Sequence, residues 1–480
     1  LAAPVLRPAP GGLVAQLRAA LPFALTAAQQ RVVAEIDADL ARPQPMHRLL
    51  QGDVGSGKTV VAALAAATAM GAGWQCALMA PTEILAEQHF RKLVGWLQPL
   101  GITVAWLTGS RKGKARQAQV AKVASGEALL VVGTHAVIQD DVVFAKLGLA
   151  IVDEQHRFGV AQRLALRKKL EGEAAPEGSV PAPGRPKPAQ PPRGVAQAQP
   201  EPGGLRLEPH LLMMSATPIP RTLAMSYYAD LDVSTIDELP PGRSPIVTKV
   251  FADGKRDAVI ARIRDEVRQG RQVYWVCPLV EESEHIDLQN ATATHAELSA
   301  ALPGTLVGLL HGRMKAAEKA AVMALFTSGE MKLLVATTVI EVGVDVPNAS
   351  LMVIEHAERF GLAQLHQLRG RVGRGAVASV CVLLYTAPLS RTGKDRLKAM
   401  AETNDGFEIA RRDLEIRGPG EFMGARQSGD ALLRFADLAE DGALLQKARE
   451  LAPRLLREHP AAAAAQVQRW LASKAEYLKA

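Results

Sequence analysis

Short apolar runs alternate with longer stretches of helical periodicity along most of the chain. Between residues 25 and 232 these runs predict strands at 47–51, 75–80, 102–107, 128–133, 149–153 and 210–215. A second series predicts strands at 272–277, 306–310, 332–336, 350–354 and 379–385. Strands that alternate with helices indicate mainly parallel sheets covered by helices, so we expect an α/β protein with two similar-sized domains in tandem.

The composition between these series sets the expected domain boundaries. Residues 1–20 are rich in Pro, Gly and Ala and then helical, and are expected to be a linker remnant. The first domain is expected over 21–237, with a disordered insertion at 171–209, where ten prolines and six glycines occur. The second domain is expected over 238–386, and the strand-free remainder, 387–480, is expected to be mostly helical.

The bulk properties narrow the class of protein. A chain of 480 residues has room for two or three cores. Its net charge of +7 fits a polyanionic partner, although a basic solvated surface gives the same value. The three widely spaced cysteines lie in apolar runs, which favours buried free thiols and a cytosolic location over a disulfide framework or a zinc site. No apolar run is long enough to span a membrane, so no membrane span is expected. The chain begins at Leu1, without methionine and without a signal-peptide pattern, so we expect it to begin inside a longer protein.

A phosphate-binding loop is predicted at residues 52–59, which read Gly-Asp-Val-Gly-Ser-Gly-Lys-Thr between an apolar run and an Ala-rich helical run. Its glycines let backbone N–H groups surround phosphates, and the helix N-terminus adds a favourable dipole. We expect Lys58 to reach the β- and γ-phosphates of a nucleoside triphosphate and Thr59 to bind Mg²⁺. The glycines expected at the nucleotide are Gly52, Gly55 and Gly57.

Two further strand ends carry side chains suited to the same site. Asp153 and Glu154 follow a predicted buried strand, where Asp153 is expected to hold Mg²⁺ and Glu154 to orient and deprotonate the attacking water. A surface acidic pair is the alternative. Ser215 and Thr217 follow the next apolar run and are expected to hydrogen-bond toward Asp153 or His156, coupling nucleotide state to movement. A helix cap or a turn would need the same hydroxyls.

The second domain contains an arginine-rich segment at 367–374, Gln-Leu-Arg-Gly-Arg-Val-Gly-Arg. Arg371 and Arg374 are three residues apart, so one helical turn places them on one face, where they are expected to clamp the γ-phosphate across a cleft. Gly343 and Asp345 are expected at the same cleft. A DNA-phosphate surface and a solvated basic face are the alternatives. One nucleotide site shared by two domains is the physical basis of a motor.

In this order, the motifs resemble those of superfamily 2 helicases and translocases, which contain two RecA-like P-loop domains. Residues 21–29 resemble the adenine-recognising element, which implies nucleotide contacts by Phe23 and Gln29, and Gln367 is implied in coupling. Segments 81–89, 108–110 and 133–135 resemble DNA-contacting segments of the first domain, and 310–314 and 336–341 resemble those of the second. The DNA-binding residues so implied are Pro81, Thr82, Thr108, Gly109, Thr134, His135, His311, Thr337 and Thr338.

Among these proteins the sequence is most similar to the RecG family of bacterial ATP-dependent DNA helicases. The segments that carry this similarity are 153–159, 214–221, 239–243 and 413–429. The last of them resembles a translocation motif, in which a helical hairpin and a loop convert domain closure into a stroke on duplex DNA. Its candidates for holding the loop or contacting phosphates are Arg411, Arg412, Arg417, Arg426 and Gln427, with ordinary surface charge as the alternative.

This resemblance implies an ATP- and Mg²⁺-dependent translocase that remodels double-stranded and branched DNA, namely stalled forks and Holliday junctions, in recombination and repair. It further implies a monomer in the bacterial cytoplasm, associated with the nucleoid and not with a membrane, and single-stranded DNA-binding protein is a candidate partner. The family's N-terminal wedge domain has no counterpart in this sequence, which leaves branch specificity open. The alternatives are the motor of a transcription-repair coupling factor, a non-catalytic DNA clamp and an RNA helicase.

Overall fold

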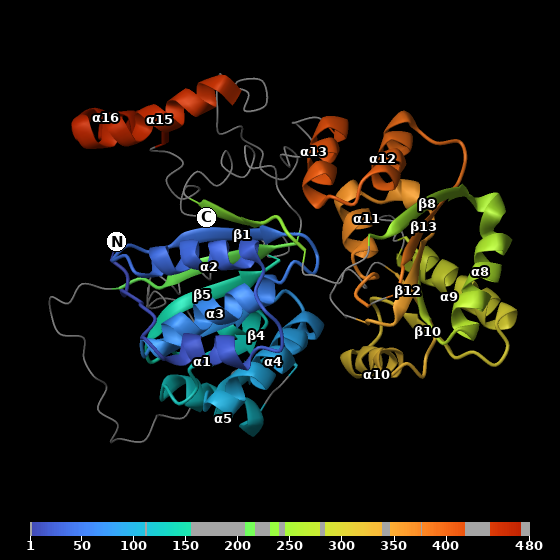
Figure 1. Cartoon of the computed structure of the whole chain (residues 1–480), viewed down its shortest axis with the longest axis horizontal. Helices are drawn as coiled ribbons and strands as arrows, with labels where there is room; N and C mark the ends of the chain where they lie inside the picture. The colour runs from blue at the N-terminus through green and yellow to red at the C-terminus, as the bar shows by residue number, and fades with distance from the viewer. Residues whose placement is uncertain are drawn as a thin grey trace, which may run out of the picture.

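The computed structural model describes residues 2–110, 113–154, 207–216, 231–239, 245–278, 284–337, 346–375, 377–417 and 442–471. These residues form two α/β units that lie side by side, followed by further helices (Figure 1). Most of the expected insertion at 171–209 lies outside the described residues. No helix of the described ranges combines the length and the apolarity needed to cross a membrane.

The first unit is a parallel sheet of seven strands in the order β3-β4-β2-β5-β6-β1-β7. Its strands are β1 His47–Gly52, β2 Gln75–Met79, β3 Val104–Leu107, β4 Leu130–Gly133, β5 Leu147–Asp153, β6 His210–Ser215 and β7 Asp232–Ile236. Its helices are α1 Leu13–Ala20, α2 Ala27–Leu40, α3 Lys58–Gly71, α4 Glu83–Leu97 and α5 Lys114–Ala124, with short 3-10 turns at Gln98–Leu100 and His135–Ile138.

The second unit is a parallel sheet of six strands in the order β10-β11-β9-β12-β13-β8. Its strands are β8 Val247–Ala252, β9 Gln272–Val276, β10 Val307–Leu310, β11 Leu333–Ala336, β12 Ala349–Ile354 and β13 Val380–Tyr385. Its helices are α8 Arg256–Arg268, α9 Glu284–Ala301, α10 Ala316–Thr327 and α11 Leu362–Arg369, with 3-10 turns at Asp253–Lys255 and Ala357–Arg359. The helices that follow are α12 Arg391–Glu402, α13 Gly406–Arg417, α15 Gly442–Glu458 and α16 Pro460–Leu471.

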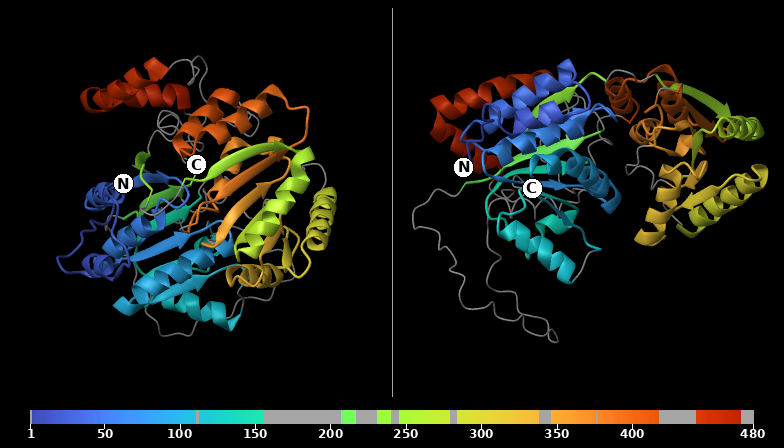
Figure 2. Two further views of the ribbon diagram at one scale, coloured as in Figure 1. Left: turned by 45° about the vertical axis from the view of Figure 1, so that its right-hand side comes forward. Right: turned by 60° about the horizontal axis from the view of Figure 1, so that its bottom comes forward.

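The two sheets have the same strand order when β8 is matched to β1, β9 to β2 and β10 to β3, and so on to β13 and β6; β7 is an additional edge strand of the first sheet. The expectation of two similar α/β units, parallel and in tandem, is therefore confirmed. Figure 2 gives two further views of the pair. In these units, as in other parallel sheets, the loops at the carboxyl ends of the strands are the expected places for binding sites.

All eleven strands predicted from the apolar runs are present, within three residues of their expected ends. Two strands, β7 and β8, were not predicted. Both lie at the edge of a sheet, and many of their residues are exposed or only partly buried. An edge strand packs on fewer neighbours than a central one, so its sequence carries no continuous apolar run.

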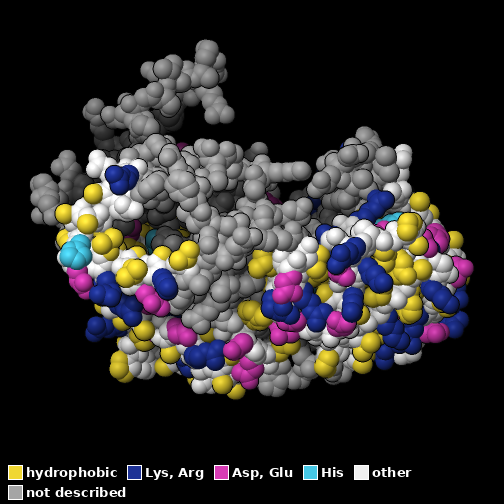
Figure 3. All heavy atoms as spheres, turned by 90° about the horizontal axis from the view of Figure 1, so that it is seen from above, with side chains coloured by type: hydrophobic (Ala, Val, Ile, Leu, Met, Phe, Trp, Pro, Cys, Tyr) yellow, Lys and Arg dark blue, Asp and Glu magenta, His cyan; other side chains and the backbone are white. Residues whose placement is uncertain are grey.

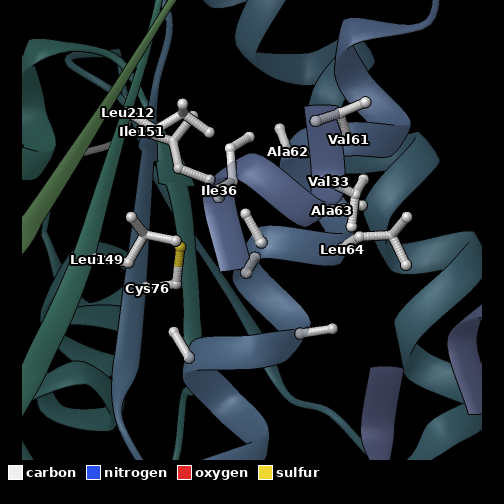
Figure 4. Close-up of a cluster of buried hydrophobic side chains, with 14 of the residues drawn as sticks. Val33, Ile36, Val61, Ala62, Ala63, Leu64, Cys76, Leu149, Ile151 and Leu212 are labelled. Atoms are coloured by element: carbon white, nitrogen blue, oxygen red, sulfur yellow. The ribbon is translucent and has the colours of Figure 1, made fainter. Parts of the chain in front are cut away.

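The core of the first unit explains the Ala-rich helix after the phosphate loop. Every residue of α3 from Val60 to Met70 is buried, and small side chains let the helix pack closely between the sheet and neighbouring helices. Ile36 of α2 and Ala62 and Ala63 of α3 belong to this core, while Cys76 and Leu149 come from the sheet (Figure 4). The three cysteines are free and buried, as expected, and burial raises the pKa of Cys381 to about 12.

The first twenty residues, expected to be a linker remnant, have buried side chains where they are described. Leu6 and Leu17 are fully buried, and α1 packs against α3. His210 of β6 also contacts the carbonyl of Pro4 at 2.8 Å through Nε2. In this structure the segment is therefore part of the packing of the first unit, because its leucines complete a core that α3 alone does not cover.

Candidate nucleotide site between the two units

The phosphate loop connects β1 to α3 and has the backbone conformation that its glycines allow. Gly55 and Gly57 have φ of +78° and +90°, a region that residues with a Cβ seldom adopt. The Lys58 ammonium donates to the carbonyl oxygens of Gly52, at 2.7 Å, and Asp53, at 3.0 Å. The lysine thus closes the loop on itself, and its two carbonyl contacts are the ones that a bound phosphate would compete for.

The electrostatic surroundings of Lys58 contain the predicted acidic pair. Burial lowers the pKa of the Lys58 ammonium, and the carboxylates of Glu154, Asp153 and Asp53 oppose that shift. In the sheet, β5, which ends at Asp153, and β1, which leads into the phosphate loop, are parallel strands separated only by β6. The structure therefore places the lysine and both predicted acidic residues at the carboxyl end of the same sheet.

Gln29 ties α2 to the phosphate loop. Its backbone N–H donates to Oγ1 of Thr26 at 3.2 Å, and its side-chain oxygen accepts from the backbone N–H of Thr26 at 3.0 Å, which forms a capping box. Its amide nitrogen donates to the carbonyl of Ser56 at 2.9 Å. A Gln amide has two N–H groups and two lone pairs, so one of each remains for a ligand. Phe23, the other predicted adenine contact, is 46% exposed and stacks edge-to-face with Trp96 at 6.2 Å.

The sheet order explains why Ser215 is close to both nucleotide-binding segments. Strand β6 lies between β5, which ends at Asp153, and β1, which leads into the phosphate loop. Ser215 ends β6, is 4% exposed and is paired in register with Gln51. A hydroxyl at this point stands between the acidic pair and the loop. The two residues predicted to act with it, His156 and Thr217, lie outside the described residues.

Asp153 has a partner that sequence reasoning missed. Nε2 of His89, a buried residue of α4, lies 2.6 Å from Oδ2 of Asp153, and the backbone N–H of Glu154 donates to Oδ1 at 3.0 Å. Burial would raise the pKa of Asp153, but the contact with His89 and the charge of Lys58 outweigh it and lower the pKa. Because His89 lies in the predicted DNA-contacting segment 81–89, it connects that segment with a predicted Mg²⁺ ligand.

Glu154, the predicted general base, has a strained backbone. Its φ is +49°, the left-handed region that non-glycine residues rarely occupy. Such conformations persist where the surrounding structure fixes them, and they gather at functional sites. The predicted general base therefore occupies the kind of backbone conformation that recurs at such sites.

The second unit meets the phosphate loop through α11 and the residues after it. Nε2 of His366 lies 2.5 Å from Oδ1 of Asp53. A Cβ added to Gly370 would lie 2.8 Å from Cβ of Val54, so the arginine-rich segment packs directly on the loop. The charge of Arg374 also lowers the pKa of Lys58.

The remaining predicted nucleotide residues of the second unit are only partly described. Arg371 follows Gly370 directly and is partly buried, and Gln367 of α11 is 5% exposed. Gly343 and Asp345 lie outside the described residues. The arginine-rich segment packs on the phosphate loop at Gly370, next to Arg371, and the roles of Arg371 and Arg374 at a nucleotide stay a prediction.

Two of the predicted DNA-binding threonines occupy equivalent places in the two units. Thr134 follows β4 and donates its backbone N–H to the carbonyl of Leu107 at 3.1 Å. Thr337 follows the matching strand, β11, and donates to the carbonyl of Leu310 at 3.1 Å. Both side-chain hydroxyls are buried and find no hydrogen-bond partner among the described residues. An unsatisfied buried hydroxyl costs stability, so each of the two calls for a partner outside the described residues, and its contact with DNA stays a prediction.

Other predicted DNA contacts have local roles in the structure. Thr82 caps α4 by accepting from the backbone N–H of Leu85 at 3.4 Å, and Oγ1 of Thr108 lies 3.2 Å from Oγ of Ser110. Gly109 and His135 are exposed, and Pro81 is partly exposed. For His311, burial and the charge of Lys319 lower the pKa. For Thr82, a cap fully accounts for the residue type.

The arginines of α13 are engaged in ion pairs. Arg411 contacts Glu408 and Glu415, while Arg412 contacts Glu402 of α12 and Glu408. These arginines lower the pKa of Glu408 to about 2. The side chain of Arg417 and the residues Arg426, Gln427 and Thr338 lie outside the described part of the chain. On the face seen in Figure 3, basic side chains are spread over both units and mixed with acidic ones.

The donor set at the loop fits Mg²⁺. Thr59, the second residue of α3, offers a hydroxyl oxygen, and Asp153 offers a carboxylate whose pKa lies below its ordinary value. Within the described ranges there is no group of three or more His, Cys, Asp or Glu side chains that could hold a metal ion by themselves. Mg²⁺ at phosphate sites usually takes one or two protein ligands and completes its shell with phosphate and water, so these oxygens suffice.

Two parallel sheets of one strand order, a single described phosphate loop and arginines supplied by the second unit define a helicase core of two RecA-like domains. Family models for DEAD/DEAH box helicases and for the helicase conserved C-terminal domain match residues 26–226 and 254–376. Residues 403–474 match the model for ATP-dependent DNA helicase RecG, domain 3, C-terminal. The chain belongs to the RecG family of ATP-dependent DNA helicases.

Several curated relatives and solved structures resemble this chain. The ATP-dependent DNA helicases RecG of Acidithiobacillus ferridurans and Escherichia coli K12 are each 55% identical, over 99% and 97% of this chain and 64% and 63% of the relatives. The chain thus spans about two thirds or less of their length. The structure of RecG bound to a three-way DNA junction is 40% identical, with a TM-score of 0.69 over 92% of this chain and 53% of that one. Dbp5 of Saccharomyces cerevisiae, bound to RNA and ADP BeF3, has a TM-score of 0.56 at 17% identity and shows the fold alone. These findings do not favour the transcription-repair coupling factor.

Proposed function

We propose that this chain is the motor of an ATP-dependent DNA translocase that, in its whole protein, remodels stalled replication forks and Holliday junctions during recombination and repair. The observation that carries the proposal is the packing of α11 and the arginine-rich segment of the second unit on the phosphate loop of the first. A nucleotide site that needs both units changes their relative position when ATP binds and is hydrolysed.

The chemistry of the site is proposed as follows. Lys58 and the loop amides bind the triphosphate, and Glu154 positions and deprotonates the attacking water. Arg371 and Arg374 neutralise charge that develops on the γ-phosphate in the transition state. Thr59 and Asp153 would hold Mg²⁺, which supplies further charge neutralisation at the phosphates when it is bound. Gln29 reads the nucleotide from the side of α2, next to Phe23.

DNA binding is proposed to use one threonine in each unit. The hydroxyls of Thr134 and Thr337 are equivalent by strand order, and each lacks a partner among the described residues. Two phosphate contacts on units that move relative to each other supply the alternating grip that translocation needs. Such contacts are insensitive to base sequence and weaken as salt rises. Duplex DNA and branched DNA are therefore the proposed partners, and single-stranded DNA-binding protein is a further proposed partner. The chain is proposed to act as a monomer in the bacterial cytoplasm, close to the nucleoid.

The test is the steady-state rate of ATP hydrolysis by this chain without DNA and with linear duplex, single-stranded DNA, a four-way junction or duplex RNA. Duplex DNA or the junction should raise kcat well above the rate without nucleic acid, and Glu154→Gln is the control for contaminating activity. A preference for the junction over the duplex would assign branch recognition to this chain. Binding of ATP without stimulation by either DNA would refute the motor, and stronger stimulation by RNA would refute the choice of substrate.

A further inference from the structure

A chain of three side chains runs from the phosphate loop into the second unit. Oδ1 of Asp53 lies 2.5 Å from Nε2 of His366, and Nδ1 of His366 lies 2.9 Å from Nη2 of Arg369. The three are well buried, since the side chains of His366 and Asp53 are 7% and 19% exposed and Arg369 is 1% exposed. We call this set the Asp53–His366–Arg369 chain. None of the three was singled out from the sequence for its chemistry.

The direction of the hydrogen bonds follows from the arginine. A guanidinium has only donors, so Nδ1 of His366 must accept from Arg369 and carries no hydrogen. The ring hydrogen is then on Nε2, which donates to Asp53. The imidazole is therefore held in one neutral tautomer with one role at each nitrogen. A flip of the ring would break both contacts, so the ring keeps its orientation. A displacement of Asp53 therefore moves the ring and, through Nδ1, Arg369.

The far end of the chain holds the turn between α12 and α13. Nη1 of Arg369 donates to the carbonyls of Met400, at 2.8 Å, and Thr403, at 2.9 Å, which lie at the end of α12. The last carbonyls of a helix lack partners within it, and a cation there also suits the helix dipole. On the other side of the turn, a Cβ added to Gly406, the first residue of α13, would lie 2.7 Å from Nε2 of His366.

The near end responds to whatever binds the phosphate loop. Lys58 donates to the carbonyl of Asp53 at 3.0 Å, so the ammonium and the His366 ring hold Asp53 from its two ends. A phosphate that draws the ammonium to itself releases the carbonyl of Asp53. The side chain of Asp53 then changes its position relative to α11, and the turn after α12 follows through Arg369.

We propose that the Asp53–His366–Arg369 chain is a positioning device that couples the state of the phosphate loop to the α12–α13 hairpin and so to movement along DNA. The proposal deepens the motor function proposed above and rests on it. His366 is a positioning residue, because the groups it touches are Asp53 and Arg369 rather than the nucleotide or DNA. Its loss should therefore reduce the DNA moved for each ATP hydrolysed more than it reduces hydrolysis.

Two substitutions at His366 separate the two contacts. His366→Gln places an amide N–H near the position of Nε2 and keeps a donor for Asp53. His366→Asn places an oxygen near the position of Nδ1, keeps an acceptor for Arg369 and is too short to reach Asp53. For each variant of this 480-residue chain, ATP hydrolysis and displacement of the third strand from a DNA triplex are measured on the same duplex. The ratio of displacement to hydrolysis is the coupling.

We expect His366→Asn, which loses the contact with Asp53, and His366→Gln, which loses the contact with Arg369, each to lower the coupling about fivefold or more, with the KM for ATP little changed. Gly406→Ala places a Cβ from α13 against Nε2 of His366 and Oδ1 of Asp53, so it should lower the coupling as well. This variant supplies the test if His366→Asn does not fold. Equal losses of hydrolysis and displacement, or a wild-type coupling in either the Asn or the Gln variant, would mean that the contacts of His366 are only structural. This inference alone fails if the wild-type chain hydrolyses ATP on DNA and displaces the third strand while every variant keeps the wild-type coupling. If the wild-type chain neither hydrolyses ATP on DNA nor displaces the strand, the proposed function fails together with this inference.

Discussion

A substitution at Gly57 tests how closely Gln29 is fitted to the phosphate loop. Gly57 precedes α3 with φ of +90°, and a Cβ there would lie 2.1 Å from Nε2 of Gln29. Gly73 follows the same helix with φ of +78°, and a Cβ there would meet nothing within 4 Å. Gly73→Ala is therefore a matched control, because both alanines strain the backbone and only Gly57→Ala displaces Gln29.

The magnitudes follow from these contacts. A left-handed alanine costs about 1–2 kcal/mol, which is the whole effect expected for Gly73→Ala. Displacing Gln29 also breaks its hydrogen bonds with Ser56 and Thr26, which are buried and contribute about 1 kcal/mol each. Gly57→Ala should thus lower the free energy of unfolding by about 2 kcal/mol more than its control, or lower the Tm by about 4–8 °C more for a unit of this size.

The assay is thermal unfolding followed by tryptophan fluorescence, since Trp74, Trp96 and Trp106 all report on the first unit. A second test uses Gln29→Ala as the background, because truncating Gln29 removes the clash. In that background Gly57→Ala should cost only the backbone strain of about 1–2 kcal/mol. The reasoning is refuted if the two glycine variants are equally stable, or if Gln29→Ala leaves the cost of Gly57→Ala unchanged.

Four further outcomes are expected. Glu154→Gln should lower kcat at least about 100-fold while ATP still binds, as measured by turnover and by nucleotide titration; normal turnover would exclude Glu154 as the base. Arg374→Ala should lower kcat about 1,000-fold with little change in ATP affinity, and a weaker affinity with unchanged kcat would remove it from the transition state. Thr134→Val and Thr337→Val should leave Tm unchanged or raise it, because each substitution removes a buried hydroxyl without a described partner. Both substitutions should nevertheless weaken DNA binding. A lower Tm with normal DNA binding would show that the hydroxyls stabilise the fold instead. Glu266→Gln should lower Tm at pH 7 and lower it progressively less below about pH 4. Burial raises the pKa of Glu266, but hydrogen bonds from a serine and an arginine outweigh it and lower the pKa, and the stabilisation that they give is lost as pH falls through the lowered pKa. An equal loss of Tm at both pH values would contradict this reasoning.

The sequence predicted the sheets well because most of their strands are buried. A central strand such as β5 packs on both faces and reads as one apolar run, whereas the edge strands β7 and β8 do not. The phosphate loop and the acidic pair were predicted because their chemistry demands residue types at fixed spacing. The burial of Leu6 and Leu17 was not, since a short Pro- and Ala-rich segment gives no sign of the core that it will join.

The contacts of the histidines were beyond the reach of local pattern. His89 and Asp153 are 64 residues apart, and His366 and Asp53 are 313 apart, so only the folded chain brings each pair together. Nothing about a histidine on a helix distinguishes these two from one that merely fills a core. A signal was available only indirectly, since both lie within or beside segments that carry predicted motifs.

Because the two sheets have the same strand order, the two units differ in function mainly through individual loops at the ends of their strands. Strand β8 matches β1 in strand order, but it is followed by the short turn Asp253–Lys255 and then α8, with no glycine-rich loop between them. The second unit therefore cannot surround a phosphate at the position where the first unit does, and it contributes α11 and the segment after it instead. Because each unit supplies groups that the other lacks, we expect hydrolysis at this site to require both units. In the proposed motor, a change at the phosphate loop then reaches the helices that pack on α11, and the difference between the two copies of the fold is what couples chemistry to motion.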